Sequence, residues 1–127
     1  MYGTGTTSNG RAASRPLDGG FTKHDAGKAP WALIGPFRGP LEQVSHVARY
    51  GSKKYARDNW RLCDDPERYY DAAQRHLWAW ADGERTDPES GLPHLAHAAW
   101  CVLALLWFET RKEKTDESDT LDRKSVV

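Results

Sequence analysis

The stretch AAWCVLALLWF, residues 98–108, decides the fold class of this chain because it is apolar on every face of a helix. A helix without a polar face lies deep in a hydrophobic core. The stretch is well short of the roughly 18–20 apolar residues that cross a bilayer, so it predicts a core helix and no membrane span. This helix should begin near Pro93 and extend to about Arg111 or Lys112.

Two further helices are expected before it. Apolar residues at helical spacing predict one helix over residues 40–57, with Pro40 in its first turn. Asp65 as N-cap, followed by Pro66, predicts a second helix through about Ala81. No region has the alternating pattern of strands, so the predicted fold is all-α, a helical bundle of three main helices with an ordered N-terminal arm.

The other segments complete one expected domain over residues 21–112. Residues 1–20 are small, polar and glycine-rich and predict a disordered leader rather than a signal peptide. Residues 21–40 combine Gly and Pro with large apolar side chains and predict an ordered, packed arm. Residues 113–127 alternate charges and predict a disordered tail. Three helices cannot surround residues 98–108, so we expect a homo-oligomer, a dimer or tetramer, to complete the bundle.

The composition excludes several classes of function. Eighteen Lys and Arg balance eighteen Asp and Glu, so the net charge gives no general attraction to membranes or nucleic acid, and stable nucleic-acid binding is not expected. Cys63 and Cys101 lack the spacing of a zinc site or of a disulfide framework. A cytoplasmic location is therefore expected.

A basic and aromatic segment, residues 53–61, can bind a nucleotide. Lysine and arginine bind phosphate oxygens, an aromatic face stacks on a base, and Asn59 can read a base edge or a sugar hydroxyl. Cations at the end of a helix can instead simply complement the helix dipole, and both interpretations remain open. Arg75 can meet a phosphate or a carboxylate, whereas His76 taken alone is more often a buried core histidine.

The segment GERTDPESGLPHLAHAAW, residues 83–100, offers donors for a metal ion. Its carboxylates suit Mg²⁺ or Mn²⁺, and its two histidines are three residues apart on a helix, close enough to share one site. Acidic loops without a metal are also common. The candidate donors are Glu84, Asp87, Glu89, His94 and His97.

The first predicted helix can add a ligand to the same ion, because Glu42 and His46 lie one turn apart on it. If the basic segment held a triphosphate, a metal ion would neutralise its charge while a carboxylate oriented a water molecule toward phosphorus. Such hydrolysis needs no serine or cysteine nucleophile. No Walker-type phosphate loop is present.

Three segments in order resemble the dATP/dGTP diphosphohydrolase family of phages and bacteria, which includes MazZ-type enzymes. They are KHDAGKAPWALI (23–34), LEQVSHVARYGSKKYARDNWR (41–61) and RYYDAAQRHLWAWADGERTDPESGLPHLAHAAW (68–100), and the similarity covers about residues 22–109. The resemblance implies an all-α fold related to MazG-like pyrophosphohydrolases and dependence on Mg²⁺ or Mn²⁺. It implies hydrolysis of a purine deoxynucleoside triphosphate, dGTP or dATP, to the monophosphate and pyrophosphate, in phage nucleotide-pool remodelling.

The resemblance and the chemistry of the residues together assign the roles. Substrate binding is assigned to Lys23, Asp25, Lys28, Lys53, Lys54, Tyr55, Asn59, Trp60, Arg75 and His76. Metal binding is assigned to Glu42, Glu84, Asp87, Glu89, His94 and His97, with Glu89 as the catalytic base and His94 sharing its metal or proton. The wider superfamily has Glu-x-x-Glu and Glu-x-x-Asp motifs on two helices, and here histidines stand where acids would be expected.

Two other classes of function remain open. A non-catalytic nucleotide or single-stranded nucleic-acid binding module would use the same Lys-Tyr-Trp segment for phosphate and stacking. The acidic loop would repel phosphate in such a module unless a metal intervened. A helical structural protein would use its tryptophans as core and its charges as solvated surface, but it does not account for the concentration of acids and histidines.

Overall fold

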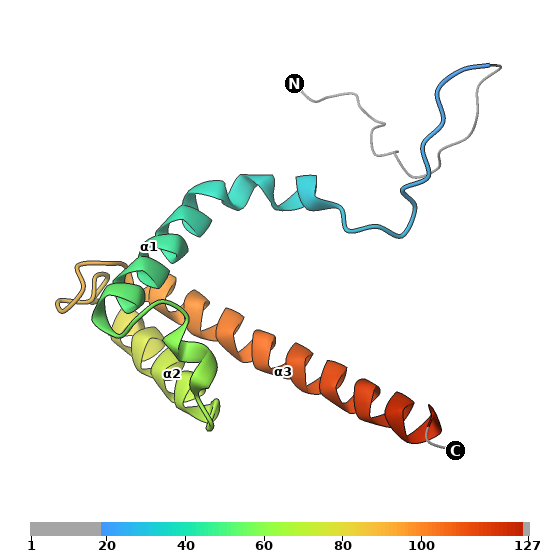
Figure 1. The fold of residues 1–127 in the computed structure, drawn as a ribbon. Helices are drawn as coiled ribbons and strands as arrows, with labels where there is room; N and C mark the ends of the chain where they lie inside the picture. The colour runs from blue at the N-terminus through green and yellow to red at the C-terminus, as the bar shows by residue number, and fades with distance from the viewer. Residues whose placement is uncertain (1–18, 126–127) are drawn as a thin grey trace. The chain divides into compact units, whose positions relative to one another are not determined.

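A computed structural model (Figure 1) describes residues 19–125, with side chains from residue 19 to residue 112. Its elements are η2 (Trp31–Phe37), α1 (Arg38–Lys54), η3 (Asn59–Leu62), α2 (Glu67–Ala81) and α3 (His94–Ser125). Over the described residues there is no strand, and one isolated antiparallel bridge joins Thr86 and Pro93. The prediction of an all-α fold with three main helices is confirmed. The predicted leader falls outside the described residues, except for its last two positions.

The chain divides into two compact units between Pro36 and Phe37. In the described part of the N-terminal unit, Phe21, Trp31 and Leu33 are all exposed. These side chains are thus not buried within their own unit, and the packing of the arm stays a prediction. Glycines and prolines interrupt regular backbone hydrogen bonding in this segment, which forms a turn and the 3-10 helix η2 without a buried residue.

Helices α1 and α2 begin and end close to the predicted positions. Pro40 stands in the first turn of α1, where its missing N–H would have had no partner within the helix. Helix α2 begins one residue later than predicted, with Pro66 in the N-cap position. The predicted cap, Asp65, makes no side-chain capping bond, and its backbone carbonyl accepts a hydrogen bond from the Arg68 N–H at 3.0 Å.

Helix α3 packs against both α1 and α2 and forms an antiparallel hairpin with α2 (Figure 1). The most deeply buried positions of this hairpin are small, with Ala73 on α2 and Ala104 on α3 each 3% exposed. On the α1 side, Val44 and Val47 pack with Ala96 of α3. Small side chains at these positions let the helices approach closely.

An aromatic cluster fixes the connector between α1 and α2 to α3. The Trp60 ring of η3 makes edge-to-face contacts with Trp100, Trp107 and Phe108, at centroid separations of 5.6, 4.8 and 5.9 Å. Such contacts stabilise beyond the apolar area that they bury. Tyr69 of α2 packs against two of these rings, Trp100 and Phe108, and so joins α2 to the cluster.

One face of α3 is left uncovered in the single chain. Leu95, Val102, Leu103 and Leu106 lie on this face and are exposed. The expectation that the three helices of one chain cannot surround this apolar helix is therefore confirmed, because α1 and α2 cover only part of it. Coverage by a second subunit stays a prediction.

Helix α3 is also longer than predicted and continues to Ser125, past the expected end at Arg111 or Lys112. No glycine or proline follows Pro93 in the sequence, and the charged segment is rich in lysine and glutamate, which favour helix. Across the described part of the chain, no helix has the length and apolar character needed to span a bilayer.

The loop from Asp82 to Pro93 is a closed turn that starts with a Schellman motif. The Gly83 N–H donates to the Trp80 carbonyl and the Glu84 N–H donates to the Ala79 carbonyl, each at 3.0 Å. Gly83 has φ +103°, which suits glycine at this position. The motif ends α2 and turns the chain back toward α3.

Backbone bonds then close the loop on itself. The Asp87 N–H donates to the Leu92 carbonyl at 2.9 Å, and the His94 N–H donates to the Arg85 carbonyl at 2.9 Å. The return of the chain needs a left-handed residue, and Gly91 supplies it with φ +74°. The loop therefore holds Asp87 and the start of α3 in a fixed relation.

A pair of glycine substitutions tests this loop. Gly91→Ala should lower the free energy of unfolding by about 1–2 kcal/mol, because alanine is strained at positive φ although no atom lies within 4 Å of the new Cβ. Gly51→Ala, in α1 and also in open space, should raise it by about 0.5–1 kcal/mol. Urea denaturation measures both values. Equal effects of the two substitutions would contradict the role of Gly91.

Candidate metal centre and nucleotide cleft

A cleft of about 860 Å³ opens between the end of α1, the connector, α2 and the start of α3. Its volume is in the range of small-molecule binding sites. Most of the predicted substrate-binding residues of the C-terminal unit line it, namely Lys54, Tyr55, Asn59, Trp60, Arg75 and His76. The structure therefore brings together on one surface residues that the sequence places on separate segments.

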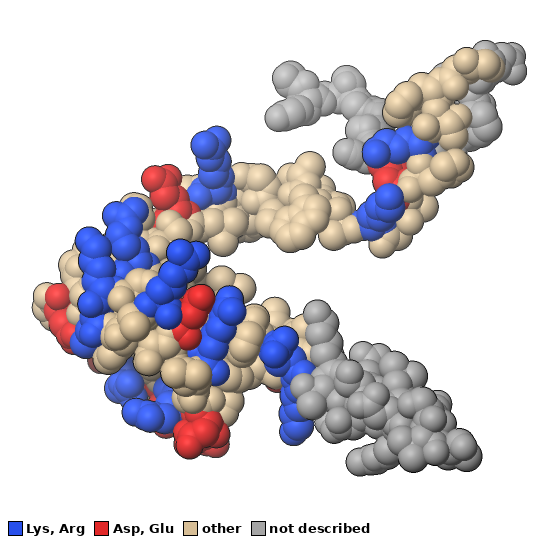
Figure 2. Space-filling view, viewed as in Figure 1, with Lys and Arg blue, Asp and Glu red and all other residues tan. Residues whose placement is uncertain are grey.

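Further cations line the cleft that the site prediction did not include. They are Arg49 and Arg68, and Arg57 of the predicted basic segment 53–61 also lines the cleft. Figure 2 shows lysine and arginine side chains gathered over the part of the molecule that contains α1 and the connector after it. Arg68 and Arg75 are seven residues apart on α2 and thus on one face of the helix, a signal that the sequence already contained.

The aromatic residues of the cleft have different surroundings. The Trp60 ring is packed edge-on against three rings of α3, so it serves the core as well as the cleft wall. Tyr55 is exposed, and the Lys54 ammonium lies 5.4 Å from its ring centroid. Tyr55 is therefore better placed than Trp60 to stack on a base.

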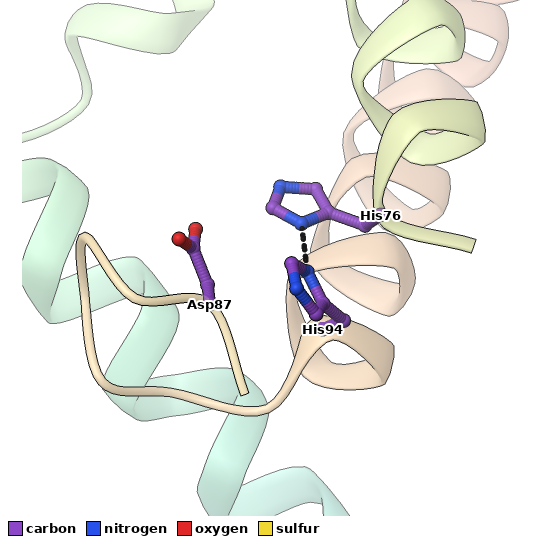
Figure 3. A group of neighbouring side chains, drawn as sticks. All are labelled: His76, Asp87 and His94. Atoms are coloured by element: carbon purple, nitrogen blue, oxygen red, sulfur yellow. Dashed lines mark hydrogen bonds between the residues drawn. The ribbon is translucent and has the colours of Figure 1, made fainter. Parts of the chain in front are cut away.

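A cluster of two histidines and one carboxylate lies at the wall of the cleft. His76, Asp87 and His94 each offer a ligand atom, and these atoms all lie within 4.8 Å of one another. Figure 3 shows His76 reaching from α2 to His94 in the first turn of α3, with Asp87 on the loop that leads to α3. The two Nδ1 atoms share a hydrogen bond of 2.9 Å. Sequence reasoning assigned His76 to the substrate, and the structure places it with the metal candidates.

Neighbouring side chains hold the histidines in place. The Nε2 atom of His94 is 2.7 Å from Oε1 of Glu84, and Nε2 of His97 is 2.7 Å from the Ser90 hydroxyl oxygen. The His97 ring stacks on the His76 ring at a centroid separation of 4.4 Å and an interplanar angle of 9°. Among the described residues, every buried side-chain nitrogen or oxygen has a hydrogen-bond partner.

Burial keeps two of these imidazoles neutral. Burial, followed by the neighbouring His97 and His94, lowers the pKa of His76 to about 4. Burial likewise lowers the pKa of His97, although Asp87 acts in the opposite direction. At neutral pH both rings are uncharged, which is the form that binds metals.

Glu89 is engaged away from this cluster. Its Oε2 atom accepts hydrogen bonds from the Lys54 ammonium at 2.5 Å and from the Tyr50 hydroxyl at 2.7 Å. These two donors lower the pKa of Glu89 and make it a weak base. The carboxylate of Glu89 thus bonds to Lys54 and Tyr50 rather than to the histidine cluster, and its assignment as catalytic base and metal ligand stays a prediction.

Other predicted ligands also lie apart. Glu42 is exposed on α1, two residues before the buried Val44, and two residues rotate an α-helix by about 200°. Glu42 therefore faces away from the core and does not line the cleft. Of the predicted metal ligands, the structure brings only Asp87 and His94 together with His76. Glu84 and His97 contact the cluster from outside.

The remaining substrate candidates are one lysine of α1 and three residues of the N-terminal unit. Lys53 is exposed at the end of α1 and is not part of the cleft wall. Lys23, Asp25 and Lys28 belong to the N-terminal unit and stay predictions. The cluster also does not match the implied Mg²⁺, which prefers an octahedral set of oxygen ligands.

Comparison with known proteins agrees with the family resemblance of the sequence. Residues 19–118 match the family described as dATP/dGTP diphosphohydrolase, N-terminal. A dATP/dGTP diphosphohydrolase of Salmonella phage PMBT28 is 37% identical over 95 residues, which are 75% of this chain and 32% of that relative. The chain thus spans about a third of the length of this relative. No solved structure gives a significant match. The chain belongs to the family of dATP/dGTP diphosphohydrolase N-terminal domains.

Proposed function

We propose that this chain hydrolyses purine deoxynucleoside triphosphates, dGTP or dATP, to the monophosphate and pyrophosphate with a divalent cation. The observation that carries the proposal is the cleft, which combines Lys54 and Arg75 with His76 and Asp87 of the cluster. The name of the phage relative supports the substrate class. The reaction would take place in the host cytoplasm and alter the nucleotide pool of an infected cell.

The residues of the cleft suit this chemistry. A water oxygen forms a bond to phosphorus, the bridging phosphoanhydride bond between the α- and β-phosphates breaks, and pyrophosphate leaves. Lys54, Arg57 and Arg75 are placed to bind the phosphate oxygens and the charge that develops on the leaving group. Tyr55 offers its exposed face to the base. A divalent cation, when bound, would polarise a phosphate oxygen and activate water.

We expect Mg²⁺ to bind the triphosphate of the substrate rather than the histidine cluster. The oxygens of a triphosphate are the ligands that Mg²⁺ prefers, so Mg²⁺ would enter with the nucleotide. A requirement for Mg²⁺ would then reside in the substrate complex rather than in the His76 cluster. A homo-oligomer that covers the exposed face of α3 is part of the same proposal.

Product analysis tests the reaction. The full chain is incubated with each deoxynucleoside and ribonucleoside triphosphate, with Mg²⁺, Mn²⁺ or Co²⁺, and products are separated by ion-exchange chromatography. We expect equal amounts of monophosphate and pyrophosphate from dGTP or dATP. Salt-sensitive binding of nucleotides or oligonucleotides without turnover under any metal would instead establish a binding module.

Two adjacent lysines give a matched test of the cleft. Lys54→Met should raise KM by about tenfold or more, because it removes a cation from the cleft and leaves the Glu89 carboxylate without its cationic partner beside the phosphates. Lys53→Met, one residue earlier and outside the cleft wall, should leave KM within about twofold of the unchanged protein. Steady-state kinetics measures both. Equal effects would place the phosphates elsewhere.

The role of Glu89 has its own test. Because Lys54 and Tyr50 hold its carboxylate, Glu89→Gln should keep kcat within about tenfold, whereas loss of a general base costs about a hundredfold or more. Glu67→Gln in the exposed first turn of α2 is the control. A fall in kcat of a hundredfold for Glu89→Gln alone would restore Glu89 as the base.

A further inference from the structure

We propose that His76, His94 and Asp87 bind one first-row transition metal ion, of the class of Co²⁺, Ni²⁺ and Zn²⁺, and that Glu84 orients His94 for this ion. The biological role of the ion rests on the proposed function, but its binding is tested without any substrate. The site thereby discriminates against Mg²⁺, the cation that the family resemblance implies.

The geometry of the three ligands supports a single shared ion. They come from three segments, with His76 on α2, Asp87 on the loop and His94 at the start of α3, and their ligand atoms lie within 4.8 Å of one another. The two Nδ1 atoms are 2.9 Å apart. Two nitrogen ligands, each about 2.05 Å from a metal ion, are separated by about 2.9 Å at the right angles of octahedral coordination and by about 3.3 Å at tetrahedral angles.

Glu84 gives His94 the orientation of a metal ligand. Metal-binding histidines usually donate their second ring N–H to a carboxylate or carbonyl, which fixes the tautomer and directs the other nitrogen to the ion. His94 is buried, its Nε2 lies 2.7 Å from Oε1 of Glu84, and its Nδ1 faces His76. The carboxylate is thus on the side of the ring away from the cluster.

His97 and Ser90 support the site without binding the ion. The His97 ring stacks on His76, and its Nε2 is bonded to the Ser90 hydroxyl. That hydroxyl also accepts the Leu92 N–H at 3.1 Å, so the loop and the His76 ring are held by one chain of contacts. Preformed ligands of this kind lower the entropy cost of binding.

The donor types determine the metal. Imidazole nitrogen suits Fe, Ni, Cu and Zn, whereas Mg²⁺ requires octahedral oxygen ligands and loses its water reluctantly. The cluster supplies two imidazoles and one carboxylate. For such a site affinity should rise from Mn²⁺ through Co²⁺ to Ni²⁺, with Mg²⁺ far weaker than any of them. His76 and Asp87 line the cleft, so an ion bound to the cluster would keep coordination positions open toward the cleft for water or phosphate.

Metal binding to the untagged full chain tests the proposal. The protein is freed of metal with a chelator and titrated with Co²⁺, with visible absorption and calorimetry as readouts and elemental analysis for stoichiometry. We expect one Co²⁺ per chain, displaced by Ni²⁺ or Zn²⁺ and retained in a large excess of Mg²⁺.

Variants locate the ion. Glu84→Gln should weaken Co²⁺ binding by about 10–100-fold. His76→Ala and His94→Ala should weaken it at least as much. His46→Ala on α1, outside the cluster, is the control and should bind as the unchanged protein does. Circular dichroism verifies folding, and Glu84 is a safe position because its side chain is 53% exposed.

Several results would overturn the proposal. They are the absence of Co²⁺ binding, unchanged affinity in the folded His76, His94 and Glu84 variants, and displacement of Co²⁺ by comparable amounts of Mg²⁺. Failure here is distinguishable from failure of the proposed function. Co²⁺ binding without nucleotide hydrolysis removes only the hydrolase, whereas hydrolysis with Mg²⁺ alone and no Co²⁺ site removes only this inference.

Discussion

The close approach of α2 and α3 through small side chains is the constraint on which the candidate site depends. Ala73 and Ala104 are the most buried of the side chains that the structure describes on the two helices. Because these side chains are short, imidazoles can bridge the gap, and His76 meets His94 across it. Larger residues at the alanine positions would force the helices apart and separate the two rings. The same small side chains therefore determine both how closely the two helices pack and whether the two histidines of the candidate site can meet.

The sequence predicted the helices and the family well, because both depend on local patterns. It could not predict which residues meet across an interface. Helical periodicity placed His76 on the apolar face of α2, but the ring that it contacts was not evident from spacing. Glu42 illustrates the reverse case, since its chemistry suited a metal and its helical position faces away from the core. Glu89 is only two residues from Asp87, yet its carboxylate bonds to Lys54 and Tyr50 rather than to the histidine cluster.

The burial of the apolar helix α3 also depends on contacts that the sequence could not predict. Periodicity showed that residues 98–108 lack a polar face, and the expectation of deep burial followed. In the structure α1 and α2 cover one side, and among the described residues no large side chain is fully buried. A chain that spans about a third of its phage relative leaves room for other parts of a longer protein, or for another copy, to cover the rest. The sequence indicates that the exposed apolar face of α3 has to be covered, but it does not reveal which segment or subunit covers it.

The contact between His76 and His94 also joins two helices that a single loop connects. A cation held there would act as a cross-link, and its binding energy would add to the free energy of folding. At a free concentration a hundred times the dissociation constant, such an ion stabilises the folded chain by about 2.7 kcal/mol. The amount of folded protein in a cell would then follow the supply of free transition metal, and the lifetime of this domain would depend on the metal homeostasis of that cell.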